Sequence, residues 1–240
     1  MPWCPAHATN VGHVAKPKAL VVEDTPEFVL FARRLLENEG FDVLVAGEGE
    51  RGVELARREA PELILLDVTL PGIDGFEVCR RIRDFSDAYI VMVTARAEEI
   101  DKVVGLTMGA DDYVTKPFSM RELSARIGAM RRRPRAAGSS EQRVFGGLEI
   151  DPQAREASLD GVPLELTKIE FDLLDLLTGT PKRAFRRDQL LRQIWGGDWY
   201  GDDHVIDVHV GNLRRKLGES ASQQRLIRTV RGVGYRFDPE

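Results

Sequence analysis

The sequence contains few cysteines and no long hydrophobic run, and each absence excludes a class of protein. Its two cysteines, Cys4 and Cys79, cannot build the disulfide framework of a small secreted scaffold. No apolar run approaches the roughly 18 residues needed to cross a bilayer. Residues 1–17 also lack the apolar segment of a secretory signal. We therefore expect a cytoplasmic protein with no membrane partner.

The 240 residues, of which 42% are hydrophobic and 30% are charged, suit one or two globular domains with substantial cores. The first 17 residues are a polar extension that carries Cys4, His7 and His13. These three side chains are a partial set of metal ligands, but scattered candidates in a loose tail rarely form a site. We expect a disordered extension instead.

Short apolar runs alternate with helical patterns between residues 18 and 132. The expected strands are 18–22, 41–46, 63–66, 89–93 and 112–115, and the expected helices are 26–38, 49–60, 76–83, 100–108 and 119–132. The four consecutive aliphatic residues at 63–66 are typical of a strand buried on both faces. Five strand–helix units in about 115 residues predict an α/β fold with a doubly wound, flavodoxin-like (CheY-like) sheet of five parallel strands.

Polar residues follow four of these strands, and they are Glu23, Asp24, Asp67, Thr94 and Lys116. Carboxyl ends of parallel strands meet at one edge of the sheet, where open α/β sheets bind ligands. Converging carboxylates suit Mg²⁺, and a carboxylate can form an acyl phosphate. Lys116 and Thr94 offer a positive charge and a hydroxyl to phosphoryl oxygens. Asp67 alone would suit an ordinary turn, but five compatible residues favour a site that handles phosphate.

Residues 131–140 break the alternation with arginines followed by small, Pro- and Gly-containing sequence, the composition of a flexible linker. The arginines suit a solvated helix end better than a nucleic-acid patch. Beyond them we expect strands at 144–150, 156–159 and 163–166, helices starting at 167, 187 and 203, and a final hairpin at 226–237. Thr167 and Glu170 have capping-box spacing, and Asp160-Gly161 is a hairpin turn signal. This order predicts an α+β winged helix-turn-helix domain.

The charge of the last part of the chain differs from that of the whole. Residues 181–237 contain twelve Lys/Arg and six Asp/Glu, a net charge of +6 within a chain of net charge −5. A local basic face in an acidic protein is typical of nucleic-acid binding, although a solvated surface is the alternative. The basic residues Arg214, Arg215 and Lys216 fall on the third predicted helix, and Arg231 falls in the hairpin. Their placement favours DNA binding.

Residues 18–132 resemble the receiver domain of two-component response regulators. The matching residues are Glu23-Asp24, Asp67 with the turns Pro71-Gly72 and Asp74-Gly75, Thr94-Ala95, and the run 109–118. The resemblance implies that Asp67 accepts a phosphoryl group from a sensor histidine kinase. It also implies that Mg²⁺ is bound by Glu23, Asp24, Asp67 and the backbone carbonyl of Thr69. By the same resemblance, Thr94 and Tyr113 form a switch pair, Lys116 contacts the phosphoryl group, and the peptide before Pro117 is cis.

The C-terminal half resembles the effector domain of the OmpR/PhoB subfamily in Thr167, Glu170 and Phe171 and in the runs 205–217 and 229–235. The resemblance implies that helix 203–217 enters the major groove while the wing around Arg231 contacts the backbone or minor groove. The candidate DNA contacts are His204, Val208, Asn212 and Arg214, with Thr229, Arg231 and Tyr235 as positioning residues. Some relatives carry arginine where this chain has Gly211 and Asn212, which leaves the base preference open.

Lys102, Asp111, Asp112, Glu122 and Arg126 match positions through which activated receivers of this subfamily pair about a two-fold axis. We expect Lys102 to pair with Glu122, and Asp112 with Arg126, between two protomers. The alternative is ion pairing within one chain, which contributes little at a surface. The expected product is a homodimer on double-stranded DNA with direct-repeat half-sites, with RNA polymerase as a further partner.

The predicted domains are a disordered extension (1–17), a receiver (18–133), a flexible linker (134–142) and a winged-helix DNA-binding domain (143–240). The predicted function is phosphorylation-dependent transcriptional regulation, not enzymatic activity. A phosphatase or phosphotransferase with an aspartate nucleophile is one alternative, but such enzymes typically place a second acid where this chain has Thr69. A single-domain signalling receiver is another alternative, but it would lack the winged-helix half.

Overall fold

The computed structural model describes residues 15–95, 99–132, 141–197 and 203–239. Most of the predicted extension at 1–17, with Cys4, His7 and His13, therefore lies outside the described residues, as does most of the predicted linker at 134–142. Among the described residues, no helix is long and apolar enough to span a bilayer.

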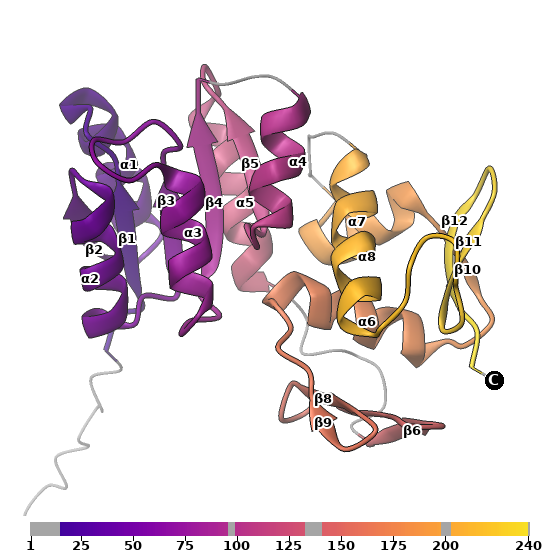
Figure 1. Ribbon diagram of the computed structural model, residues 1–240. Coiled ribbons are helices and arrows are strands. Elements are labelled where there is room, and N and C mark those ends of the chain that lie inside the picture. Colours follow the sequence, from indigo (N-terminus) through magenta and orange to yellow (C-terminus); the bar gives the residue numbers. More distant parts are fainter. Residues whose placement is uncertain (1–14, 96–98, 133–140, 198–202, 240) are drawn as a thin grey trace, which may run out of the picture.

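The N-terminal half is a five-stranded parallel sheet with helices on both faces, as predicted. The strands run in the order β2 (Asp42–Ala46), β1 (Lys18–Val22), β3 (Leu63–Leu66), β4 (Tyr89–Thr94) and β5 (Asp112–Thr115). The helices are α1 (Pro26–Asn38), α2 (Gly49–Glu59), α3 (Gly75–Arg83), α4 (Glu99–Thr107) and α5 (Met120–Arg132). Figure 1 shows α2, α3 and α4 on one face of the sheet, with α1 and α5 on the other.

The central strand β3 positions the residue that follows it. All four residues of β3 are fully buried, and the strand is hydrogen-bonded to β1 on one side and β4 on the other. The chain then turns tightly into α3, where the Asp74 side chain caps the helix by accepting from the Glu77 N–H at 2.9 Å. A Cβ on Gly75 would lie 2.1 Å from the Asp67 carbonyl oxygen, so only glycine allows α3 to begin this close to Asp67.

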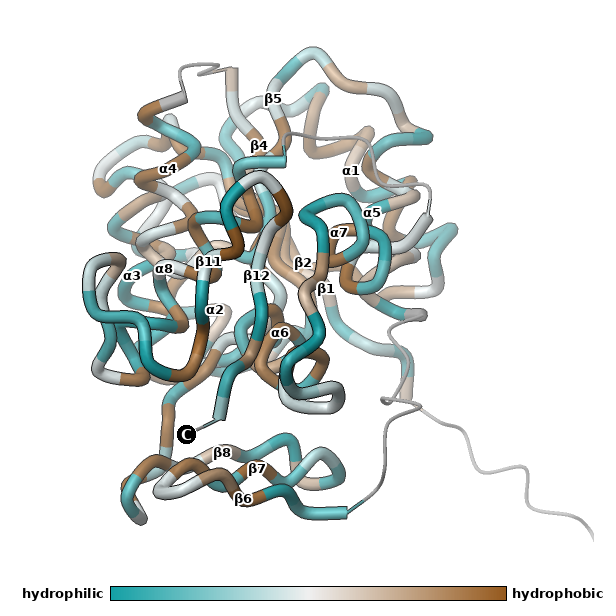
Figure 2. The backbone as a smooth tube through the Cα atoms, turned by 90° about the vertical axis from the view of Figure 1, so that its right-hand side faces the viewer, coloured by the Kyte–Doolittle hydropathy of each residue, from teal (hydrophilic) through white to brown (hydrophobic). Residues whose placement is uncertain are grey.

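The C-terminal half contains two antiparallel sheets around three helices. The four-stranded sheet consists of β6 (Arg143–Phe145), β7 (Leu148–Asp151), β8 (Glu156–Leu159) and β9 (Val162–Pro163). The helices are α6 (Lys168–Gly179), α7 (Arg187–Trp195) and α8 (His204–Lys216), and the final sheet has the order β10 (Ala184–Arg186), β12 (Gly234–Phe237), β11 (Ile227–Val230). Figure 2 shows the four-stranded sheet lying apart from the other two, as does Figure 1.

Two strand predictions in this half were wrong in detail. The expected strand 144–150 is divided into β6 and β7 by a turn at Gly146, whose φ is +60°. Where a strand was expected at 163–166, the structure has the two-residue strand Val162–Pro163. The three-residue strand β10 was not predicted. The capping box at the start of α6 is confirmed, because Thr167 accepts from the Glu170 N–H at 3.3 Å and Glu170 accepts from the Thr167 N–H at 2.8 Å.

The two halves pack against each other through helices. Helix α8 lies against α4, and α7 lies against α5 (Figure 1). Two side chains of α8 bond to backbone carbonyls of the N-terminal half. The amide nitrogen of Asn212 donates to the Leu106 carbonyl at 2.9 Å, and the Nε2 of His209 lies 3.1 Å from the Asp111 carbonyl.

Candidate functional site

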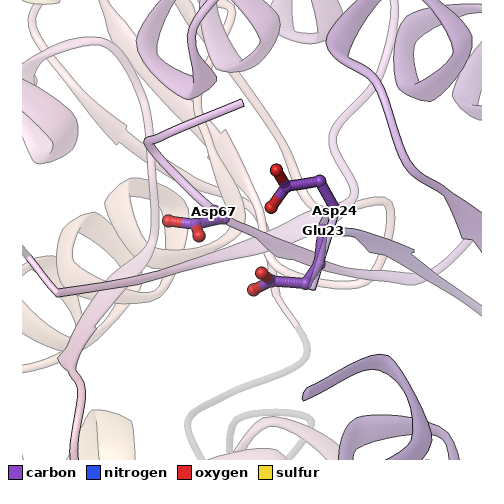
Figure 3. A group of neighbouring side chains, drawn as sticks. All are labelled: Glu23, Asp24 and Asp67. Carbon is purple, nitrogen blue, oxygen red and sulfur yellow. The ribbon is translucent and has the colours of Figure 1, made fainter. Parts of the chain in front are cut away.

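Three carboxylates meet at the carboxyl edge of the parallel sheet (Figure 3). Glu23 and Asp24 follow β1 and Asp67 follows β3, and because these strands are neighbours their ligand oxygens lie within 4.8 Å of one another. Glu23 and Asp67 are buried, whereas Asp24 is exposed. Glu23 accepts from the Thr25 N–H at 3.2 Å and Asp67 from the Thr69 N–H at 3.2 Å, so local turns orient both buried carboxylates.

Lys116 brings a positive charge into this cluster from the end of β5. Its Nζ lies 2.6 Å from Glu23 Oε2 and 3.0 Å from Asp67 Oδ2. Burial lowers the pKa of Lys116, but the hydrogen bonds to the two carboxylates outweigh it, and the net pKa lies above its ordinary value. The ammonium therefore stays charged beside Asp67. The peptide between Lys116 and Pro117 is cis, as the resemblance implied.

Thr94 and Tyr113 lie on neighbouring strands beside the cluster. Thr94 is the last residue of β4 and is fully buried, and its carbonyl accepts from the Lys116 N–H at 2.8 Å. Tyr113 pairs in register with Met92 of β4, and 6% of its surface is exposed. The structure thus places Thr94 at the edge where the carboxylates gather, with the Tyr113 side chain buried.

Two of the residues expected to pair between protomers pair within the chain. Arg126 donates to both carboxylate oxygens of Asp112 at 2.7 Å, and both side chains are almost fully buried. Glu122 also contacts Arg126, at 3.1 Å. In this arrangement Arg126 already binds two carboxylates of its own chain, and the expected pairing of Asp112 with Arg126 of a second protomer stays a prediction.

Asp111 and Lys102 complete the expected dimer residues. The Asp111 carboxylate accepts from Arg83 at 2.5 Å and from the Ile90 N–H at 2.9 Å, so it also bonds within the chain. Lys102 lies half-buried on α4. Arg83 in addition donates to the Gly109 carbonyl at 2.7 Å, which ties the end of α3 to the segment before β5.

The seven candidate DNA-contact residues divide by exposure. His204, Thr229 and Arg231 are exposed, Val208 is half-buried, and Asn212, Arg214 and Tyr235 are buried. The structure does not support Arg214 as a DNA contact, because its guanidinium donates to the Ile227 carbonyl at 3.0 and 2.8 Å and to the Thr229 hydroxyl at 2.9 Å. Arg214 instead joins α8 to β11.

Tyr235 and Asp207 form a polar centre that the sequence did not indicate. The Tyr235 hydroxyl donates to Asp207 at 2.6 Å, and Arg187 donates to the same carboxylate oxygen at 2.7 Å. Burial and then the bond to Asp207 raise the pKa of Tyr235 to about 12. Asp207 therefore holds α8 to the start of α7 and to β12. This role could not be predicted from the sequence, since a single aspartate within a helix has no distinguishing pattern.

Asn212 and His209 are buried where α8 meets the N-terminal half. Because a carbonyl only accepts, the bond to Asp111 requires His209 to carry its proton on Nε2. The other ring nitrogen, Nδ1, is buried and has no hydrogen-bond partner among the described residues. The Asn212 amide is bound to the Leu106 carbonyl, so a candidate base-reading side chain contacts protein backbone here.

Comparison with known proteins identifies both halves. Residues 19–128 match the response regulator receiver domain, and residues 161–237 match the family described as transcriptional regulatory protein, C terminal. The transcriptional regulatory protein AfsQ1 of Streptomyces coelicolor is 47% identical over 223 residues, which cover 93% of this chain and 99% of AfsQ1. The alkaline phosphatase synthesis transcriptional regulatory protein PhoP of Bacillus subtilis is 43% identical, over 92% of this chain and 96% of PhoP.

Solved structures extend the similarity to the fold. A RitR mutant superposes with a TM-score of 0.77 at 26% identity, covering 94% of this chain and all of that chain. DrrB of Thermotoga maritima, an OmpR/PhoB homologue, is 30% identical over 93% of this chain and all of DrrB, with a TM-score of 0.50. The chain therefore belongs to the OmpR/PhoB-type response regulators of two-component systems, with a receiver domain followed by a DNA-binding winged-helix domain.

Proposed function

We propose that Asp67 is the phosphoacceptor through which a sensor histidine kinase controls DNA binding by this chain. The observation that supports this role is the meeting of Glu23, Asp24, Asp67 and Lys116 at the carboxyl edge of the sheet. A carboxylate oxygen of Asp67 would attack the phosphorus of the kinase phosphohistidine. The P–N bond breaks as the new P–O bond forms, and the product is an acyl phosphate on Asp67.

The same residues suit Mg²⁺, which prefers hard oxygen ligands and binds through one or two carboxylates together with phosphate oxygens. Glu23, Asp24, Asp67 and the carbonyl of Thr69 would hold the ion. Bound there, it would offset the negative charge shared by the carboxylates and the incoming phosphoryl group. Lys116 at present pairs with both Glu23 and Asp67, so the ammonium would exchange one carboxylate partner for a phosphoryl oxygen.

Thr94 and Tyr113 would couple phosphorylation of Asp67 to a structural change in the α4–β5 region. Phosphorylation adds a charge of about −1.5 to −2 and strong acceptor oxygens, which favour a hydroxyl donor such as Thr94. Tyr113 lies on β5 directly beside β4, so a movement of Thr94 is transmitted to packed neighbours. The adjoining α4–β5 region is the surface that binds α8 in this structure.

Release of α8 from this surface would free both halves for their functions. The freed receiver (18–133) would form a homodimer through the face that carries Lys102, Asp111, Asp112, Glu122 and Arg126. The freed winged-helix domain (143–240) would place α8 in the major groove of double-stranded DNA, with two copies on direct-repeat half-sites. The DNA-bound dimer would act in the cytoplasm and would contact RNA polymerase. Exposed His204, Thr229 and Arg231 support the DNA-binding role of α8 and the wing.

Intact mass and sedimentation test this proposal. Wild type, Asp67→Ala and Asp84→Ala are each incubated with Mg²⁺ and acetyl phosphate. Asp84 is an exposed carboxylate at the end of α3, outside the pocket, and serves as the matched control. We expect one added phosphoryl mass and a dimer for wild type and Asp84→Ala, and neither for Asp67→Ala. Wild type that gains no mass, or dimerises equally without the donor, would refute the proposal.

A further inference from the structure

An aromatic ring lies against the charged end of Lys116. The ammonium nitrogen is 4.3 Å from the centre of the Phe28 ring, which belongs to the first turn of α1. An ammonium group has three N–H donors, and here Glu23 and Asp67 accept from it. The negative face of the ring attracts the cation without accepting its proton, and this attraction strengthens as the cation is withdrawn from water.

The Phe28 ring is itself held from two parts of the chain. Phe31 lies one turn further along α1, with its ring centre 5.8 Å from that of Phe28. Phe118, two residues after Lys116, packs edge-on against Phe28 at 5.8 Å and against Phe31 at 6.0 Å. The three rings therefore connect α1 to the segment that carries Lys116. Lysine is otherwise a flexible side chain with four methylene groups, so this packing restricts it.

We propose that Phe28 is a positioning residue that keeps the Lys116 ammonium directed at the phosphoryl site on Asp67. This inference rests on the proposed role of Asp67. On phosphorylation, the contacts of Lys116 with Glu23 and Asp67 must rearrange, because metal and phosphoryl oxygens take part. The contact with the ring involves none of these groups, so it persists while the ammonium changes partners.

Three variants separate this role from ordinary packing. Phe28→Leu removes the ring but keeps an apolar side chain, and Phe28→Tyr keeps the ring. Phe31→Leu removes a neighbouring ring of the same cluster that makes no described contact with Lys116, and is the matched control. Phosphoryl gain from acetyl phosphate with Mg²⁺ is followed by intact mass, and urea unfolding monitors stability.

We expect Phe28→Leu to gain the phosphoryl group about three- to tenfold more slowly, which corresponds to the usual strength of a cation–π contact. Both Phe28→Tyr and Phe31→Leu should gain the phosphoryl group at the wild-type rate. In a Lys116→Ala background, Phe28→Leu should produce no further loss, since coupling between two residues disappears when one is absent. Equal rates for wild type and Phe28→Leu would overturn the inference, as would an equal loss in Phe31→Leu.

A second readout needs neither metal nor phosphodonor. The ring current of Phe28 should shift the NMR signals of the Lys116 ε-methylene protons upfield in wild type, in Phe28→Tyr and in Phe31→Leu, and this shift should vanish in Phe28→Leu. Unchanged lysine signals in Phe28→Leu would overturn the inference. Wild type that gains no phosphoryl group would instead refute the role of Asp67, and the positioning role with it.

Discussion

Acidification should separate the two domains by protonating His209. This residue is completely buried between α8 and the receiver, where Nε2 donates to the Asp111 carbonyl and Nδ1 has no partner among the described residues. A proton on Nδ1 would create a buried charged donor without an acceptor. Burial accordingly lowers the pKa of His209, although the nearby carboxylates of Asp111, Glu170 and Asp112 act in the opposite direction.

The sign and size of the effect follow from linkage. The packed form holds His209 with a lowered pKa, whereas separated domains expose it with an ordinary pKa of about 6.5, so the packed form binds fewer protons and is weakened as pH falls. A change from about pH 7.5 to about pH 5.5 therefore shifts the equilibrium towards separation by at most about tenfold, or about 1.4 kcal/mol, the limit reached when the packed form takes up no proton.

Small-angle X-ray scattering of the unphosphorylated protein measures the separation as an increase in radius of gyration. His209→Gln retains an N–H donor for Asp111 but cannot titrate, so its scattering should be independent of pH in this range. His204→Gln is the matched control, because it removes an exposed histidine from the same helix, five residues before His209. This variant should respond to pH like wild type. A pH response in His209→Gln as large as that of wild type would refute the reasoning.

Three further predictions concern charged side chains with ionic or hydrogen-bond partners in the structure. Arg214→Ala should lower the free energy of unfolding of the C-terminal domain by about 2 kcal/mol through loss of its bonds to Ile227, and an unchanged urea midpoint would contradict this. Arg126→Leu leaves Asp112 buried without its cation and should cost about 3–5 kcal/mol, measured by thermal unfolding. Lys116→Ala should tighten Mg²⁺ binding about fivefold, because no ammonium competes for the carboxylates; calorimetry showing weaker binding would exclude this competition.

The parallel sheet was predictable because its signals are local. A fully buried strand such as Leu63–Leu66 must be apolar along its whole length, and the residue that follows it must lie at the sheet edge. The convergence of Glu23, Asp24 and Asp67 follows from strand order, which the alternation of strands and helices largely determines. The capping box at Thr167 needs only three residues of spacing.

Features that depend on contacts between residues far apart in the chain could not be predicted from the sequence. From its place on a basic helix, Arg214 was predicted to face DNA. In the structure it binds the Ile227 carbonyl, which is 13 residues away and on another element. The bond from Asn212 to Leu106 spans 106 residues and two domains, and no periodicity records it. The division of β6 from β7 depended on a positive φ at Gly146, which a Gly-Gly pair permits without requiring.

The bond between Asn212 and the Leu106 carbonyl has a consequence for anyone who redesigns the operator preference of this regulator. If Asn212 reads a base, the same amide serves two competing acceptors, one on DNA and one on the receiver. A substitution of Asn212 chosen to recognise a new promoter would also remove its hydrogen bond to the receiver and so weaken the packing of α8 in the unphosphorylated protein. Under the proposed release of α8, altered specificity at this position would therefore come with DNA binding that depends less on phosphorylation, unless a compensating change were made on α4.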